Sequence, residues 1–154
     1  GYGRIGQALG RMAQGLGMNV VAYDIYHVEG IECETMHYVT MDELLAQSDF
    51  ISLHTPAIDG KPLINRENIA KMKDGVIFVN TSRGNNVDEE ALLEGLNSGK
   101  IRGAGLDVYA EEPAKNEALL NHPNVSCNEG SAEAHRPGDR LHHRKYVTPG
   151  PEAR

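Results

Sequence analysis

The chain begins with a glycine-rich run, Gly1 to Gly6, in which the glycines are spaced G-x-G-x-x-G. In such a run the first glycine permits a tight turn, the second (Gly3) lets backbone amides approach a pyrophosphate, and the third lets the following helix pack close to a strand. Asp24 follows after a further seventeen residues, at the end of an apolar stretch. A carboxylate there would accept hydrogen bonds from ribose hydroxyls and repel a 2′-phosphate. The pattern therefore predicts a dinucleotide site that prefers NAD to NADP.

A glycine run alone is weak evidence, because glycines at this spacing often only terminate elements. The carboxylate at the expected distance, with a helical and a strand pattern in between, makes the prediction much stronger. In a unit of this kind a buried strand stands immediately before the first glycine, and here the sequence starts at Gly1. We therefore expect a fragment of a longer polypeptide that lacks the first central strand.

A second candidate group surrounds Arg83, which comes directly after the apolar segment 75–81. The guanidinium is always charged, and its planar fork can hold a carboxylate together with the neighbouring carbonyl or hydroxyl of a substrate. The alternative is a surface arginine that pairs with Glu89 or Glu90. Its position between a hydrophobic strand and Gly84 favours the role in substrate binding.

Two acidic residues form the third group. Asp107 ends an apolar segment, where an unpaired buried carboxylate would be unfavourable, so it requires donors such as a nicotinamide carboxamide or Arg83. Glu112 precedes a proline and could raise the pKa of a catalytic imidazole and hold its tautomer. The alternative for Glu111 and Glu112 is an exposed acidic turn.

The elements that must position these residues alternate along the chain. Apolar patterns predict strands over 19–24, 49–54, 75–81, 102–108 and 124–127, and helices over 5–16, 40–47, 66–72 and 88–98. Thr40 and Glu43 form a capping box for the second helix, whereas 25–38 is polar. Regular alternation indicates an α/β fold, a Rossmann-like doubly wound parallel sheet. Ligands bind beyond the carboxyl ends of such strands, where Gly3, Asp24, Thr55, Arg83 and Asp107 fall.

The domain organisation follows from length and pattern. The 154 residues suffice for one domain, which we assign to 1–128 as an incomplete NAD-binding unit. The tail 129–154 has almost no apolar periodicity and is expected to be disordered. We expect no separate substrate domain within these residues. His142 and His143 in this basic tail are more often solvated than metal-bound, so we expect no metal site.

Charge and cysteine content narrow the partners. Residues 1–134 contain ten Lys and Arg against twenty Asp and Glu, which argues against nucleic acid and anionic membranes as partners. Cys33 and Cys127 lie 94 positions apart, in no disulfide or metal-ligand pattern. There is no apolar run long enough to cross a membrane and no signal-peptide pattern, although a missing N-terminus would also remove one. A reducing cytoplasm is the expected location.

Four motifs in this order resemble the cofactor domain of the D-isomer-specific 2-hydroxyacid dehydrogenases. They are Gly1–Gly6 with Asp24, His54–Pro56, Asn80–Gly84, and the segment 106–113, and the resemblance covers residues 1 to about 127. The stretch 119–126 is most similar to bacterial 3-phosphoglycerate dehydrogenases. The resemblance implies an NAD-dependent enzyme that moves a hydride to or from C2 of a small 2-hydroxy or 2-oxo acid, with 3-phosphoglycerate as the expected substrate. It also implies a parent protein that forms a homodimer or higher homo-oligomer.

The resemblance also implies individual roles. The backbone amides of Arg4 and Ile5 would bind the pyrophosphate, and Asp24 the adenosine ribose. The nicotinamide side would be lined by Thr55, Pro56, Thr81 and Ser82, with Asp107 holding the carboxamide. Arg83 would bind and polarise the 2-oxo acid, and Glu112 would support the general acid/base.

The chain departs from the family where the catalytic histidine should stand, in a Pro-His-x-Gly segment after the last strand. Here Cys127 is followed by Asn128 and Glu129, while His122 comes too early and His135 too late. We therefore expect little activity, and interpret the tail as having left the family's reading frame. Two other functions stay open: a non-catalytic NAD-binding or corepressor-like module, and a glyoxylate, hydroxypyruvate or lactate reductase.

Overall fold

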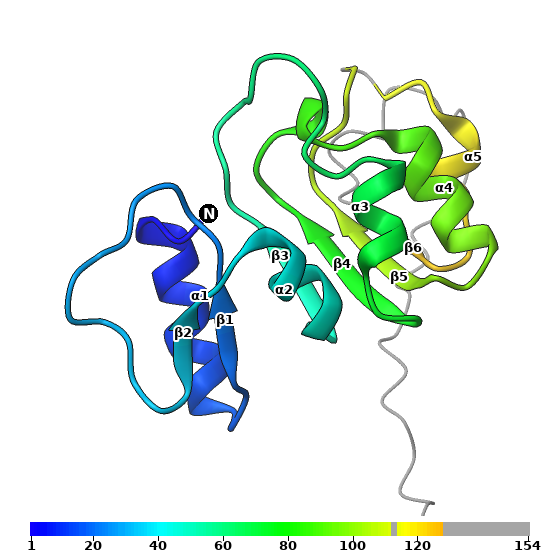
Figure 1. Cartoon of the computed structure of the whole chain (residues 1–154). Helices are drawn as coiled ribbons and strands as arrows, with labels where there is room; N and C mark the ends of the chain where they lie inside the picture. The colour runs from blue at the N-terminus through cyan, green and yellow to red at the C-terminus, as the bar shows by residue number, and fades with distance from the viewer. Residues whose placement is uncertain (112–113, 128–154) are drawn as a thin grey trace, which may run out of the picture.

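The computed structural model describes residues 1–111 and 114–127, in which strands and helices alternate (Figure 1). The strands are β1 (Val20–Ala22), β2 (Met36–Tyr38), β3 (Phe50–Leu53), β4 (Val76–Asn80), β5 (Ile101–Leu106) and β6 (Val125–Cys127). The helices are α1 (Arg4–Gly15), α2 (Met41–Gln47), α3 (Arg66–Lys71), α4 (Glu89–Asn97) and α5 (Glu117–Leu120), with a 3₁₀ turn η1 (Gly84–Asn86).

The strands form two parallel sheets. One contains β1 and β2, and the other has the order β3-β4-β5-β6. In Figure 1 the two-stranded sheet lies with α1 on one side of the molecule, the larger sheet lies on the other, and the N-terminus is between them. Within residues 1–111 and 114–127 no strand joins β1 to β3. This arrangement confirms the predicted Rossmann-like α/β fold with a gap where the first central strand was expected.

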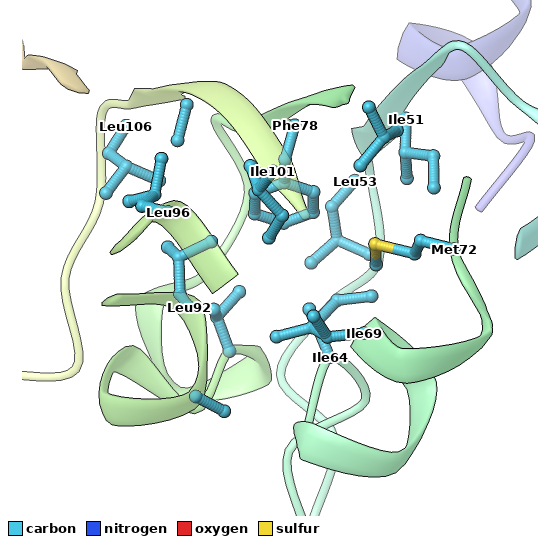
Figure 2. Packing of buried hydrophobic residues seen from close by; sticks show 14 of the residues in the cluster. Ile51, Leu53, Ile64, Ile69, Met72, Phe78, Leu92, Leu96, Ile101 and Leu106 are labelled. Atoms are coloured by element: carbon cyan, nitrogen blue, oxygen red, sulfur yellow. The ribbon is translucent and has the colours of Figure 1, made fainter. Parts of the chain in front are cut away.

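The core lies between the larger sheet and its helices, and Figure 2 shows its centre. Strand β4 alternates buried and partly buried positions, and its Phe78 is fully buried. Side chains from β3, β5, α3 and α4 meet it, among them Ile51, Leu53, Ile69, Leu92, Leu96, Ile101 and Leu106. Burial of these apolar groups holds the strand ends in place, and the candidate site lies at those ends.

Helix α1 packs differently. Its buried residues are Gly6 and Gly10, and a Cβ atom at Gly10 would lie 2.2 Å from the Tyr2 hydroxyl. Tyr2 itself is buried in the small cluster around β1 and β2. The apolar side chains at helical spacing remain exposed, Ile5 at 69% and Leu16 at 81%. This helix is therefore held by close contact at its glycines rather than by its larger side chains.

The predicted boundaries are confirmed to within two residues for the elements expected from the sequence, and the capping box is confirmed in detail. Glu43 N donates to Thr40 Oγ1 at 3.3 Å, and Thr40 N donates to Glu43 Oε2 at 2.8 Å. Three elements were missed: β2 lies inside the stretch 25–38 that was read as polar, η1 follows Arg83, and α5 lies inside 114–123. Each is only three or four residues long, too short for a periodic signal.

Several expectations concern residues outside the described ranges: Glu112, His135, His142, His143 and the tail 129–154. Within the described ranges both cysteines are free thiols. None of the described helices has the length and apolar character needed to cross a membrane. The same residues contain no cluster of three or more side chains suited to hold a metal ion.

Candidate functional site

The carboxyl ends of the strands in the larger sheet are aligned. The register pairs Leu53 with Asn80, Asn80 with Leu106, and Leu106 with Cys127. Because parallel strands in register end at one edge, the segments that follow them leave the sheet together. The residues predicted from the sequence at Thr55, Thr81–Arg83 and Asp107 therefore come to one edge, as expected.

The glycine turn lies between the carboxyl ends of β1 and β3. The Gly1 nitrogen donates to the Tyr23 carbonyl at 3.0 Å, and a Cβ atom at Gly1 would lie 2.6 Å from the His54 carbonyl oxygen. A Cβ atom at Gly6 would lie 2.6 Å from the Gly1 carbonyl oxygen. The close contact of Gly6 is therefore with the glycine turn itself, and its role in helix–strand packing stays a prediction.

The N-terminus of α1 fits a phosphate group. Gly3 is the N-cap residue, forms no side-chain cap and would have no atom within 4 Å of an added Cβ. The first intrahelical bond runs from Gln7 N to Gly3 O at 2.9 Å. The amides of the preceding residues, including Arg4 and Ile5, thus have no intrahelical acceptor, and with the helix dipole they favour an anion. The open space at Gly3 is where a pyrophosphate would meet them.

Asp24 lies just after β1 and is fixed by backbone amides. Its Oδ2 accepts from Tyr2 N at 2.5 Å and its Oδ1 from Tyr26 N at 3.0 Å. Partial burial acts to raise the pKa of Asp24, but these hydrogen bonds outweigh it and hold the pKa below its ordinary value. The carboxylate is therefore charged at neutral pH. Each oxygen keeps a lone pair that can accept from a ribose hydroxyl.

The segment after β4 is shaped by Asn80, whose side chain is 1% exposed. Its Nδ2 donates to the Arg83 carbonyl at 3.0 Å, and its Oδ1 accepts from the Ser82 amide at 3.0 Å and hydroxyl at 2.9 Å. This bends the backbone back on itself and leaves Thr81 exposed. The turn thus presents the Arg83 side chain at the edge of the sheet.

The Arg83 guanidinium is exposed and donates through Nη1 to the Ser82 carbonyl at 2.7 Å. Within the described part of the chain it forms no ion pair, and Glu89 instead accepts from Ala110 N at 2.8 Å. The alternative of a surface pair with Glu89 or Glu90 is therefore not observed. The fork keeps donors that a carboxylate could engage.

Asp107 is exposed, so the premise that it is a buried carboxylate in need of donors is wrong. Its position is nevertheless fixed, because Asp107 N donates to the Asn80 carbonyl at 3.0 Å. Gly84 brings the two loops together: a Cβ atom there would lie 1.8 Å from the Tyr109 carbonyl oxygen. The loops that carry Arg83 and Asp107 are therefore in direct contact.

Two imidazoles lie in the described part of the chain near the ends of strands of the larger sheet. His54 follows β3, its Nε2 is 2.9 Å from the Ser52 hydroxyl, and burial lowers its pKa, helped by the nearby N-terminal amine. His122 precedes β6, and its Nδ1 accepts from Asn124 N at 3.1 Å. His122 thus lies before its strand, and the sequence had also indicated that it comes too early for the catalytic histidine.

Sequence reasoning missed Asn86. It lies in η1, is fully buried, and binds the segment that contains Thr55 and Pro56 through its side-chain amide. It likewise gave no role to Asn80. Both asparagines flank Arg83 in the chain, and a pair of amides around a candidate site residue is the signal that could have found them. Thr55 is half-buried and Pro56 exposed.

Residues 1–129 match the model of the D-isomer specific 2-hydroxyacid dehydrogenase NAD-binding domain. A hydroxypyruvate reductase of Blautia hydrogenotrophica is 55% identical over 121 residues, which are 78% of this chain and 38% of that protein. A D-3-phosphoglycerate dehydrogenase of Methanocaldococcus jannaschii is 45% identical over 129 residues, 81% of this chain and 24% of that protein.

A solved structure gives the same picture in three dimensions. The structure of D-lactate dehydrogenase with NAD⁺ from Lactobacillus jensenii aligns with a TM-score of 0.76 at 33% identity, over 84% of this chain and 43% of that one. The chain thus spans less than half the length of each of these relatives. Family match, sequence identity and fold agree. The chain belongs to the D-isomer specific 2-hydroxyacid dehydrogenases, as a member of their NAD-binding domain family.

Proposed function

We propose that the chain is the NAD-binding part of an oxidoreductase that interconverts a small 2-oxo acid and a D-2-hydroxy acid. The observation that carries this proposal is the pairing of the glycine turn with Asp24. The carboxylate is bonded to the amide of Tyr2, inside that turn, and lies beside the uncapped N-terminus of α1. Amide donors for a phosphate and a carboxylate acceptor for ribose hydroxyls are thereby held next to each other, which is the arrangement that a dinucleotide requires.

On the adenosine side, the amides of Arg4 and Ile5 would bind the pyrophosphate and Asp24 the ribose hydroxyls. The charge of Asp24 would repel a 2′-phosphate, so NAD would be preferred to NADP. On the nicotinamide side, Thr55, Pro56, Thr81 and Ser82 would line the site. Asp107, held by its amide against Asn80, would accept from the carboxamide.

When bound, NADH supplies the hydride for C2 of the substrate. Arg83 would hold the substrate carboxylate with its fork and stabilise the charge that develops on the C2 oxygen. That oxygen also requires a proton, and Arg83 does not release one at neutral pH. Glu112 would support an imidazole in that role. Because loss of a general acid/base removes about 10²–10⁴-fold in rate, we propose that this chain alone turns over at a rate close to background.

For the substrate we propose hydroxypyruvate as the first compound to test and 3-phosphohydroxypyruvate as its rival. The hydroxypyruvate reductase relative is the more similar of the two named above in sequence identity. The phosphoglycerate dehydrogenase relative is the reason to test the phosphorylated acid as well. The substrates of lactate and glyoxylate enzymes differ from these in the group that C2 carries besides its oxygen and the carboxylate, and Arg83 does not contact that group in this scheme. We also propose that the full-length parent is a homodimer, which its mass in solution would test.

The deciding experiment is a calorimetric titration of the chain with NADH and NADPH, alongside Asp24→Asn. We expect NADH to bind more tightly than NADPH, and the variant to lose most of that preference. Asp74→Asn is the matched control, because Asp74 pairs with Lys100 on the surface away from the glycine turn. Equal affinity of the unmutated chain for both nucleotides would refute the role of Asp24.

A second candidate function, a non-catalytic NAD-binding module, is favoured by the absence of a Pro-His-x-Gly segment after β6. A binding module would show the same nucleotide preference as the oxidoreductase, so only a turnover assay can distinguish these two functions. In a chain extended to the length of its relatives and given that segment, an enzyme should oxidise NADH on addition of a 2-oxo acid. No turnover with hydroxypyruvate, 3-phosphohydroxypyruvate, pyruvate or glyoxylate would favour the binding module.

A further inference from the structure

The side chain of Asn86 is an amide with no exposure to solvent, and both of its ends are hydrogen-bonded. Its Nδ2 lies 2.7 Å from the Pro56 carbonyl oxygen and 3.0 Å from Thr55 Oγ1, with the Thr55 carbonyl oxygen at 3.4 Å. Its Oδ1 accepts from Ile58 N at 3.0 Å. One side chain therefore binds three residues of the segment 55–58, about thirty positions earlier in the chain.

The backbone of the same turn also binds the chain further on, at Ile64. Ile64 N donates to the Asn86 carbonyl at 3.0 Å, and Asp88 N donates to the Ile64 carbonyl at 2.8 Å. The chain between 58 and 64 is thus closed into a loop anchored at both ends on residues 86–88. An amide is unfavourable to bury unless it is bonded at both ends, so an apolar residue would serve here if filling space were the only requirement.

The contacts of Asn86 also set the orientation of Thr55. The Thr55 hydroxyl oxygen accepts from Asn86, while its methyl carbon Cγ2 lies 3.2 Å from the position of a Cβ atom on Gly1. The side chain is therefore fixed between the glycine turn on one side and Asn86 on the other. Within the described residues its hydroxyl makes this one hydrogen bond, so the hydroxyl hydrogen points to no acceptor of the chain itself.

We propose that Asn86 is a positioning residue of the cofactor site. It holds the segment 55–58 against the glycine turn, so that the half of the cofactor beyond the pyrophosphate meets a preformed surface rather than a loop that must be ordered on binding. The proposal rests on the proposed function, since it requires that a dinucleotide binds at this edge. It assigns no direct ligand contact to Asn86, which is fully buried.

The test compares Asn86→Leu and Asn86→Asp with the unmutated chain by two measurements. The first is hydrogen exchange at the Ile58 amide. The second is calorimetric affinity for NADH and for ADP-ribose, which lacks the nicotinamide. We expect Asn86→Leu to speed exchange at Ile58 and to weaken NADH about tenfold, while ADP-ribose changes less than about twofold. Asn86→Asp keeps the acceptor for Ile58 but loses the donors to Thr55 and Pro56, so it should weaken NADH by itself, even if Asn86→Leu fails to fold.

Asn68→Ala is the matched control. The Asn68 side chain donates to the Leu63 carbonyl at 2.7 Å, so it holds the same loop between 58 and 64 at a point away from the glycine turn. It should leave the ratio of NADH to ADP-ribose affinity and the Ile58 exchange rate at their original values. Equal loss of both ligands in the Asn86 variants, or no loss of either, would overturn the proposal. If neither ligand bound the unmutated chain, the proposed function would be wrong, and this inference would fall with it.

Discussion

Gly84→Ala should destabilise the chain, and the structure indicates by how much. The added Cβ would lie 1.8 Å from the Tyr109 carbonyl oxygen and 1.9 Å from its carbon, where ordinary contact begins at 3.4 Å. Both atoms are backbone, so no side-chain rotation relieves the overlap. The loop is also tied at both ends, by Asp107 N to Asn80 O and by Ala110 N to Glu89 Oε1. It must therefore move by more than an ångström and break at least one of these bonds.

The magnitude follows from the opposing effects of the added methyl group. Overpacking a well-filled site costs about 1–3 kcal/mol, and the upper end applies because Tyr109 is only 5% exposed. Restricting the unfolded chain returns at most about 1 kcal/mol. The net loss should be about 2 kcal/mol, which lowers the melting temperature by roughly 5–10 °C.

Urea denaturation followed by circular dichroism would measure this loss. Gly15→Ala is the control, because Gly15 is the last residue of α1 and has no atom within 4 Å of an added Cβ. That variant should be neutral or gain up to about 1 kcal/mol from helix propensity. A Gly84→Ala chain as stable as the Gly15→Ala chain would refute the contact between the loops after β4 and β5.

Three further predictions concern other parts of the molecule. In a chain extended to the length of its relatives and given the Pro-His-x-Gly segment, Arg83→Lys should lower turnover of a 2-oxo acid roughly tenfold or more, because a lysine cannot form the fork. NADH affinity by calorimetry should stay unchanged, and equal losses would make Arg83 a cofactor ligand. Asp24→Asn should lower the free energy of unfolding at neutral pH. Because the pKa of Asp24 is lowered in the fold, this loss should be full above the ordinary carboxyl range and vanish only as the pH falls through the lowered pKa. A series of urea midpoints at different pH values checks this, and a loss that grows in acid contradicts it. Thr40→Ala removes the capping box of α2 and should cost about 1 kcal/mol in the same denaturation assay without changing NADH affinity.

Local chemistry explains which elements the sequence could predict. The capping box at Thr40 depends on a partner three residues away, so the short-range pattern sufficed, and the box is present. Strand β2 depends instead on pairing with β1, from Val20 with Met36 to Ala22 with Tyr38. Met36 is the one residue of this strand whose side chain is fully buried. No local pattern carries that pairing, so the strand was read as a polar stretch.

The candidate site divides in the same way. Residue type and distance from a strand end placed Asp24, Thr55 and Arg83 correctly at the carboxyl edge. Burial was harder to predict: Asp107 ends an apolar strand yet is exposed, because β5 ends at Leu106 and the next side chain is already beyond the core. Asn86 is the reverse case, a polar residue that is buried. Its hydrogen-bond partners lie about thirty positions earlier, so no local pattern indicated this burial.

The site is divided between the two sheets, and this division has an energetic consequence. The glycine turn and Asp24 belong with β1 and α1, whereas Thr55 and Arg83 follow strands of the larger sheet. Gly1 touches both parts, through the Tyr23 and His54 carbonyls. A ligand that contacts both parts binds only when they are correctly placed, and its binding free energy then stabilises that placement. If a nucleotide binds as proposed, from Asp24 to Arg83, it would therefore act as a structural link between the sheets.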